Sequence, residues 1–136
     1  MLGSAPLIAF VATTDPARAR AFYGGTLGLA PTGETAFAVV FDAHGTMLRV
    51  TAAPAVAPAP YTVLGWAVPD LAAAMAELGR RGVTFERHAG LEQDAQGVWT
   101  TPGGDRVAWF RDPDGNVLSM TEFAAAAEGQ SVAAPV

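Results

Sequence analysis

The chain has 136 residues, a formal net charge of −5, eight arginines without any lysine, and no cysteine. This length predicts one domain, and 51% hydrophobic residues are too many for a disordered chain. The lack of cysteine excludes disulfides and thiolate metal sites, and the lack of lysine excludes Schiff-base and P-loop chemistry. The arginines are scattered through the sequence, so we expect no nucleic-acid partner.

Two stretches bear on targeting and on membrane insertion. The first ten residues lack the charged segment of a signal peptide, which makes the cytoplasm the expected location. Residues 50–69 are uncharged and long enough to span a bilayer, but they contain four prolines, which a helix does not tolerate. We therefore interpret them as an extended linker between two strands and expect no membrane partner.

The first half predicts a strand, a helix and a hairpin in that order. Residues 6–14 form a short apolar run typical of a buried strand. Asp15, followed by a proline, starts a helix that glycines at 24 and 25 should end. Residues 35–42 and 46–52 then predict two strands paired across a tight turn.

The second half, after the linker, repeats this order. It predicts a strand over 61–68, a helix from Asp70 to Gly82, a short strand over 83–88, a hairpin that turns at 102–104, a turn at 112–116 and a last strand over 117–123. The tail, 124–136, has no anchoring pattern and is expected to be flexible.

The two halves align with each other, which indicates a duplicated module. Asp15 and Asp70 start equivalent helices, and Gly45 and Gly115 lie in equivalent turns. Each half has the order βαβββ, over residues 6–52 and 61–123. Because neither half can cover both faces of its own sheet, we expect them to form a single domain over residues 1–123.

Two stretches carry a resemblance to a known family: TTDPARARAFYGGTLGL at 13–29 and FRDPDGNVLSM at 110–120. With their spacing and the duplication, they resemble the vicinal oxygen chelate superfamily, which includes glyoxalase I, extradiol dioxygenases and bleomycin-resistance proteins. The resemblance covers residues 6–123. It implies an α+β fold in which two βαβββ modules form a curled, barrel-like cup of mixed sheet, with helices outside and a ligand site inside. It also implies a homodimer.

Strand alternation predicts which side chains face this cup. Leu118 and Met120 should pack under a helix, so Ser119 faces the other way, and pairing across the turn places Trp109 opposite it. The same alternation predicts further inward residues: Ile8, Phe10, Phe37, Val39, Phe41, Met47, Arg49, Thr51, Tyr61, Val63 and Gly65.

The resemblance also indicates where a metal would bind. In metal-dependent members of the superfamily, four inward positions carry His, Glu or Gln, and here these positions are Ile8, Arg49, Val63 and Ser119. Two alkyl groups, a guanidinium and a hydroxyl are poor ligands for a divalent ion, because zinc and related metals need imidazole, carboxylate or thiolate donors. We therefore expect neither a metal nor another cofactor.

Arg49 is the one charged residue among the predicted inward strand positions, and it has two interpretations. It could bind a ligand carboxylate or phosphate through its planar guanidinium, or it could pair with a carboxylate of the 86–94 segment. The aromatic residues likewise either line an apolar pocket or simply fill the core; they are Phe10, Phe37, Phe41, Tyr61, Trp99 and Trp109.

The polar segment 86–94 leaves two alternatives open. His88 lies among acidic residues, so a displaced metal site is conceivable, although the spacing fits no ligand motif. The other interpretation is a polar loop over the mouth of the cup, in which Glu92 or Gln93 offers hydrogen bonds to a ligand. His44, at a turn, is expected to be solvated.

The sequence therefore favours a metal-free protein that binds a small apolar molecule, or one that is both apolar and anionic. The expected contacts are Ile8, Phe10, Phe41, Arg49, Tyr61, Val63, Glu92, Trp99, Trp109 and Ser119. One alternative is a lyase, isomerase or dioxygenase with relocated metal ligands, or with a loop carboxylate such as Glu92 as general base. Another is a regulatory or interaction module whose cup is filled by its own side chains.

Overall fold

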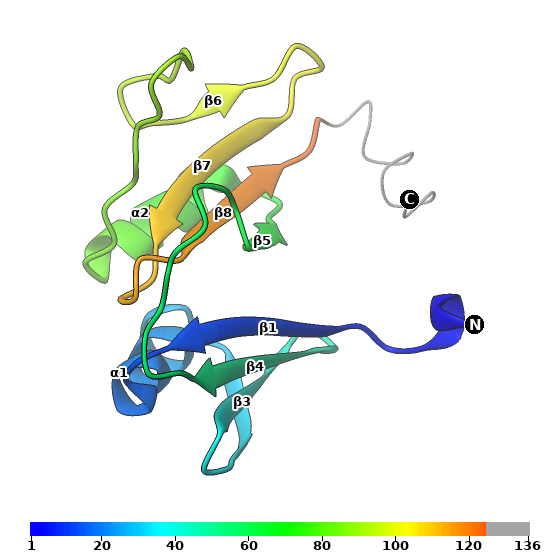
Figure 1. Ribbon diagram of the computed structural model, residues 1–136. Coiled ribbons are helices and arrows are strands. Elements are labelled where there is room, and N and C mark those ends of the chain that lie inside the picture. Colours follow the sequence, from blue (N-terminus) through cyan, green and yellow to red (C-terminus); the bar gives the residue numbers. More distant parts are fainter. Residues whose placement is uncertain (125–136) are drawn as a thin grey trace. The chain divides into compact units, whose positions relative to one another are not determined.

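The computed structural model describes residues 1–124 of the chain and divides into two compact units (Figure 1). The first unit comprises Met1–Leu64 together with Asp112–Asn116, and the second comprises Gly65–Arg111 and the chain from Val117 onward. Each of the two halves contributes one four-stranded sheet and one main helix. The α+β class and the two βαβββ modules predicted from the sequence are confirmed.

The first module contains four strands in the order β1-β4-β3-β2. β1 pairs in parallel with β4, and the other neighbours are antiparallel. The elements are η1 (Leu2–Ser4), β1 (Ile8–Thr13), α1 (Pro16–Arg20), η2 (Ala21–Thr26), β2 (Ala30–Glu34), β3 (Ala38–Ala43) and β4 (Thr46–Ala52). The predicted βαβββ order implies the strand β2, but no residue range was predicted for it, because its five residues are exposed, include a proline and a glycine, and carry no apolar pattern.

The first helix begins where the sequence predicts and continues past its predicted end. The Asp15 carboxylate accepts a hydrogen bond from the Arg18 amide at 3.1 Å, which is the expected N-cap. The glycines at 24 and 25 do not end the helix, because a wider π turn, η2, carries it to Thr26. Gly24 instead serves close packing: a Cβ there would lie 3.3 Å from the ring of Phe41.

The second module repeats the arrangement with the strand order β5-β8-β7-β6. Asp70 caps its helix by accepting a hydrogen bond from the Ala73 amide at 3.0 Å. The elements are β5 (Leu64–Ala67), α2 (Leu71–Arg80), β6 (Trp99–Thr100), β7 (Arg106–Arg111) and β8 (Val117–Glu122).

The predicted strand over 83–88 is wrong. These residues have no partner strand, although the Glu86 amide donates to the carbonyl of Trp109 at 2.8 Å. The side chain of Gln93 satisfies other backbone groups of the segment, because its Nε2 donates to the Glu86 carbonyl and its Oε1 accepts from the His88 amide. A side-chain amide thus takes the place of a sheet ladder, which local strand propensity does not reveal.

Each module has its own buried core between helix and sheet. Tyr23, Phe41, Leu48 and Val50 are almost fully buried in the first module, and Leu71, Phe110 and Leu118 in the second. No helix among residues 1–124 is both long enough and apolar enough to cross a bilayer. The predicted tail, 124–136, lies outside the described residues except for Ala124.

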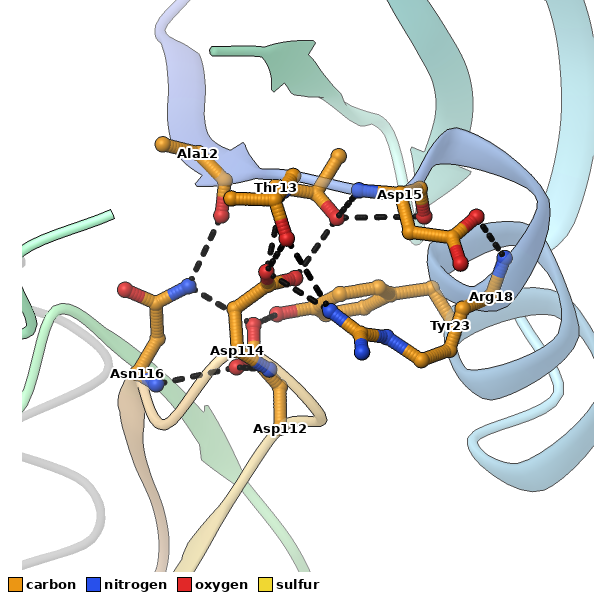
Figure 2. A network of polar contacts seen from close by, with 9 residues as sticks. Ala12, Thr13, Asp15, Arg18, Tyr23, Asp112, Asp114 and Asn116 are labelled. Atoms are coloured by element: carbon orange, nitrogen blue, oxygen red, sulfur yellow. Dashed lines mark hydrogen bonds and ion pairs between the residues drawn. The ribbon is translucent and has the colours of Figure 1, made fainter. Parts of the chain in front are cut away.

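The turn between β7 and β8 belongs to the first unit and is held there by two carboxylates (Figure 2). The Asp112 carboxylate accepts from the Tyr23 hydroxyl at 2.7 Å and from the Asn116 side chain at 2.8 Å. Burial and the nearby Asp112 charge raise the pKa of Tyr23 far above its ordinary value, so the phenol stays protonated and keeps donating. Asn116 also donates to the carbonyl of Ala12 at 2.9 Å.

The second carboxylate, Asp114, binds the end of β1 and the start of α1 (Figure 2). It accepts hydrogen bonds from the Thr13 hydroxyl at 2.6 Å, from the Thr14 amide and hydroxyl at 2.9 Å, and from Arg18 at 2.9 Å. Burial alone would raise the pKa of Asp114, but the bonds from Thr13 and Thr14 and the charge of Arg18 lower it overall. The group is therefore an ionised carboxylate with several donors.

We expect Asp114→Asn to lower the free energy of unfolding by about 1 to 3 kcal/mol at neutral pH, since it removes hydrogen bonds to a charged group. The lowered pKa of Asp114 stabilises the folded chain above the unfolded-state value of about 3.9 and ceases to do so as the pH falls through the native value. The difference between the two proteins should therefore narrow below about pH 4. Urea denaturation over a pH series measures this.

The matched control is Glu34→Gln, which breaks an ion pair between Glu34 and Arg20 whose side chains are both more than 40% exposed. Such exposed pairs contribute less than about 1 kcal/mol. Equal losses in the two variants, or a gap for Asp114→Asn that does not change with pH, would contradict the proposed role of the turn carboxylate.

Candidate functional site

Strand register in the first module gathers apolar side chains around Arg49. Phe10 of β1 and Val40 of β3 both pair with Arg49 of β4, and Ile8 pairs with Met47. Paired residues lie on the same face of a sheet, so these five residues form one surface, here called the Arg49 face. The other face carries Leu48, which is buried against the helix side of the module.

Much of the Arg49 face is accessible. Phe10 is 59% exposed, Ile8 45% and Met47 41%, which is high for large apolar side chains. A hollow of about 550 Å³ lies at one end of the face, lined by Leu7, Ile8, Thr32, Asp42 and Met47 among others. A volume of this size suits a small ligand.

Arg49 is half-buried, and within residues 1–124 it has neither an ion pair nor a side-chain hydrogen bond. Of the acidic residues in the 86–94 segment, Glu86 pairs with Arg111 of its own unit at 2.8 Å. A guanidinium is always charged and carries five donors in a planar fork. The face therefore offers an available cation beside exposed apolar groups.

The predicted orientation of Phe41 is wrong. Phe41 pairs with Leu48 and Val39 pairs with Val50, so both face the helix rather than Arg49. Phe41 is fully buried, with its ring centroid 6.1 Å from that of Tyr23. The prediction failed because residues 38–41 are all buried, so this strand lacks the alternation of buried and exposed residues that distinguishes its two faces. Val40, which does lie on the Arg49 face, was missed for the same reason.

Three other predicted aromatic and aliphatic positions lie outside strands. Tyr61 and Val63 precede β5, which begins at Leu64, and their side chains are 67% and 38% exposed. Phe37 precedes β3 and is also largely exposed. Prolines at 58 and 60 keep the chain extended just before this point, and strand pairing starts only after them.

In the second module, Trp109 pairs with Ser119 across β7 and β8, as the sequence predicted. Ser119 is 7% exposed, and a Cβ on Gly65 would lie 3.1 Å from its hydroxyl oxygen. The glycine thus allows the hydroxyl to lie close to the β5 backbone. The side chain that the last strand directs to this face is a small alcohol packed against a glycine.

The indole rings of Trp99 and Trp109, here called the indole pair, stack with their centroids 6.1 Å apart and their planes 28° apart. The ring of His88 meets Trp109 edge-on at 4.7 Å. The contact between His88 and Trp109 was not predicted from the sequence, which suggested only a displaced metal site for His88. No sequence pattern could have indicated this contact, because Trp109 and His88 are 21 positions apart and no local motif connects them.

A second hollow, of about 500 Å³, lies beside Trp99 and includes Leu91, Glu92 and Val98 in its lining. Glu92 is exposed there. The Gln93 side chain is engaged by its own segment: Nε2 donates to the carbonyls of Glu86 and Gly97, and Oε1 accepts from the His88 amide. Both donor hydrogens are therefore used, which leaves one lone pair of Oε1 for the predicted bond to a ligand.

The residues at the superfamily's metal positions do not fit a metal ion. Ile8 and Val63 have no donor atom, Arg49 is a permanent cation, and the Ser119 hydroxyl is a neutral oxygen packed against Gly65. In the part of the chain that the structure describes, no group of three or more His, Asp or Glu side chains comes close enough together to hold one.

Comparison with known proteins places these features in a family. The model of the family described as the Glyoxalase/Bleomycin resistance protein/Dioxygenase superfamily matches residues 7–120. A search of curated proteins found no match.

Several solved structures are similar over most of the chain. The antibiotic binding protein TnmS3 from a Streptomyces species is 27% identical with a TM-score of 0.70, and the match covers 91% of this chain and 99% of that one. A superfamily member from Sphaerobacter thermophilus is 25% identical with a TM-score of 0.70, covering 90% and 100%. Lactoylglutathione lyase from Agrobacterium tumefaciens is 20% identical with a TM-score of 0.67, covering 88% and 93%, which shows a shared fold alone.

The two face assignments in the first module can be tested by a pair of truncations. Phe41→Ala should lower the free energy of unfolding by about 3 to 5 kcal/mol, as expected when a fully buried aromatic ring is removed. Phe10→Ala should change it by less than about 1 kcal/mol, because the ring is already largely in water. Chemical denaturation of both variants measures this, and a reversed order would refute the faces described here.

Proposed function

Because the chain belongs to the glyoxalase/bleomycin resistance protein/dioxygenase superfamily, we propose that it binds a small, largely apolar molecule with an anionic group on the Arg49 face, without a metal ion. In this proposal the protein sequesters or carries the molecule and does not transform it. The predicted contacts on this face are Ile8, Phe10 and Arg49, joined here by Val40 and Met47.

The observation that carries the proposal is that Arg49 is half-buried and has no ion-pair partner in its unit. The residue lies beside Phe10 and Val40. Asp42 lies on the same face through its pairing with Met47, but no carboxylate of the first unit forms an ion pair with Arg49. Partial removal of a cation from water is unfavourable unless an anion or hydrogen-bond acceptors compensate. A carboxylate or phosphate ester would do so with two parallel hydrogen bonds, which the planar guanidinium is suited to make.

The surroundings of Arg49 favour an apolar body for the same ligand. Phe10, Ile8 and Met47 present accessible carbon surface on the same face, next to the hollow of about 550 Å³. Burial of apolar surface stabilises by about 25 cal/mol per Å², so a ring-sized ligand that covers these side chains gains several kcal/mol before entropy losses. The similarity to an antibiotic binding protein at 27% identity supports a binding role.

Two alternatives are weaker. A metal-independent enzyme with Glu92 as general base has in its favour that Glu92 lines the hollow beside Trp99. However, the sequence and the fold of residues 1–124 indicate no general acid or nucleophile that would act together with Glu92. A regulatory module whose interior is filled by its own side chains has no specific observation in its favour. The proposal also keeps three expectations from the sequence. They are a cytoplasmic location, a homodimer, and ligand contacts from the other predicted site residues.

We expect 2-naphthoate, an apolar carboxylate, to raise the melting temperature of the protein, because its carboxylate would pair with Arg49 and its rings would cover Phe10. Arg49→Met, which keeps an unbranched apolar side chain and removes the charge, should abolish most of that rise. Differential scanning fluorimetry over a ligand series measures the effect.

Two controls separate the charge of Arg49 from charge in general. Arg80→Met removes an exposed arginine of α2 that pairs with Glu77, and it should leave the rise unchanged. The neutral analogue 2-naphthamide should raise the melting temperature less than 2-naphthoate. An equal rise in Arg49→Met and the parent protein would exclude Arg49 as the anion contact.

Protein purified without chelator should contain well under one equivalent of metal, because the superfamily's metal positions hold no competent donor set. Elemental analysis by mass spectrometry measures the content. Stoichiometric zinc, nickel, manganese or iron that survives dialysis would refute the metal-free part of the proposal and favour an enzyme with relocated ligands.

A further inference from the structure

His88 occupies a fixed place in an irregular segment of the second module. Its amide donates to Gln93 Oε1 at 2.7 Å, and Gln93 Nε2 donates to the carbonyls of Glu86 at 3.0 Å and Gly97 at 2.7 Å. The carbonyl of His88 accepts from the Leu91 amide at 3.2 Å. The backbone that carries the imidazole is thus held from both sides, although it belongs to no strand.

The imidazole itself is incompletely satisfied. Among the buried side-chain nitrogens and oxygens of residues 1–124, His88 Nε2 alone has no hydrogen-bond partner. The ring packed against it is the indole of Trp109, met edge-on at 4.7 Å, and an indole offers no acceptor lone pair. Buried polar atoms are nearly always paired, so an unpaired one is a candidate for contact with a ligand.

We propose that His88 Nε2 is a polar contact for a ligand that lies against the indole pair. Such a ligand would supply the missing hydrogen-bond partner while its body covers Trp109 and Trp99. The inference rests on the proposed function in so far as the chain binds small molecules, but it uses residues of the second module and does not involve Arg49.

The chemistry of the cluster indicates a class of ligand. Trp99 and Trp109 present nearly parallel ring faces, which favour a planar aromatic body by offset stacking. A neutral imidazole nitrogen either donates or accepts, so a hydroxyl or carbonyl oxygen on that body completes its hydrogen bonding. Trp99, but not Trp109 or His88, lines the hollow of about 500 Å³, so a body of two fused rings would have to extend from this hollow to the imidazole. The ligand class is therefore a hydroxylated or carbonyl-bearing aromatic compound.

The test compares 2-naphthol with 2-methylnaphthalene, two probes of nearly the same shape that differ in the hydroxyl group. Saturation-transfer difference NMR over a concentration series gives their dissociation constants. We expect the parent protein to bind 2-naphthol about fivefold more tightly than 2-methylnaphthalene, since a satisfied buried hydrogen bond contributes about 1 kcal/mol. His88→Phe, which keeps an aromatic ring against Trp109, should abolish that preference.

Two more variants test whether the preference depends on a hydrogen-bonding group at position 88. His88→Gln retains such a group and should keep part of the preference, and it replaces His88→Phe if that variant does not fold. His44→Asn, at the turn between β3 and β4 where His44 has a positive φ of 51°, should keep all of it. If His88→Phe folds and retains the preference, the nitrogen is satisfied within the protein by the indole ring, and the inference is wrong.

The failure of this inference differs from the failure of the proposed function. Loss of the hydroxyl preference together with an intact, Arg49-dependent response to 2-naphthoate rejects His88 alone. A hydroxyl preference that depends on His88, without any response to 2-naphthoate, rejects the anion site alone. If the parent protein binds neither naphthol nor methylnaphthalene, the aromatic ligand class is rejected.

Discussion

The buried carboxylates of Asp112 and Asp114 join segments of the chain that lie about one hundred residues apart. Asp114 accepts hydrogen bonds from Thr13 and Thr14, and Asp112 accepts one from Tyr23. Charged acceptors with several donors are among the stronger polar interactions in proteins, and they become costly when a partner is lost. The turn of the second half thereby becomes part of the first unit, at the end of β1 where the strand leads into α1.

The end of β1 matters because β1 supplies Phe10 and Ile8 to the Arg49 face. The parallel pairing of β1 with β4 sets Phe10 opposite Arg49, and a shift of one residue would turn both side chains to the other face. The helix that follows β1 covers that other face through Tyr23 and Gly24, which pack on Phe41. The same short stretch of sequence thus serves the core on one side and the candidate site on the other.

The two modules share a fold but present different chemistry. The first offers a cation among aliphatic and phenyl groups, whereas the second offers stacked indoles, an imidazole and a small alcohol. The residues at the superfamily's metal positions supply no set of imidazole or carboxylate donors, so the apparatus for Lewis-acid chemistry is not provided by them. A fold can persist while its site changes in this way, because the core of each module lies on the opposite face of its sheet.

Much of this protein could be predicted from its sequence. The helix caps at Asp15 and Asp70, the hairpin turn at Gly45 and the pairing of Trp109 with Ser119 follow from rules that involve residues a few positions apart. Tertiary structure decided the rest. Phe41 faces the core, and its orientation could not be predicted because residues 38–41 are all buried and show no alternation. Residues 83–88 form no strand, and the Gln93 side chain instead bonds the Glu86 carbonyl and the His88 amide. The contact of His88 with Trp109 likewise depends on burial and on partners distant in sequence, which local patterns do not encode.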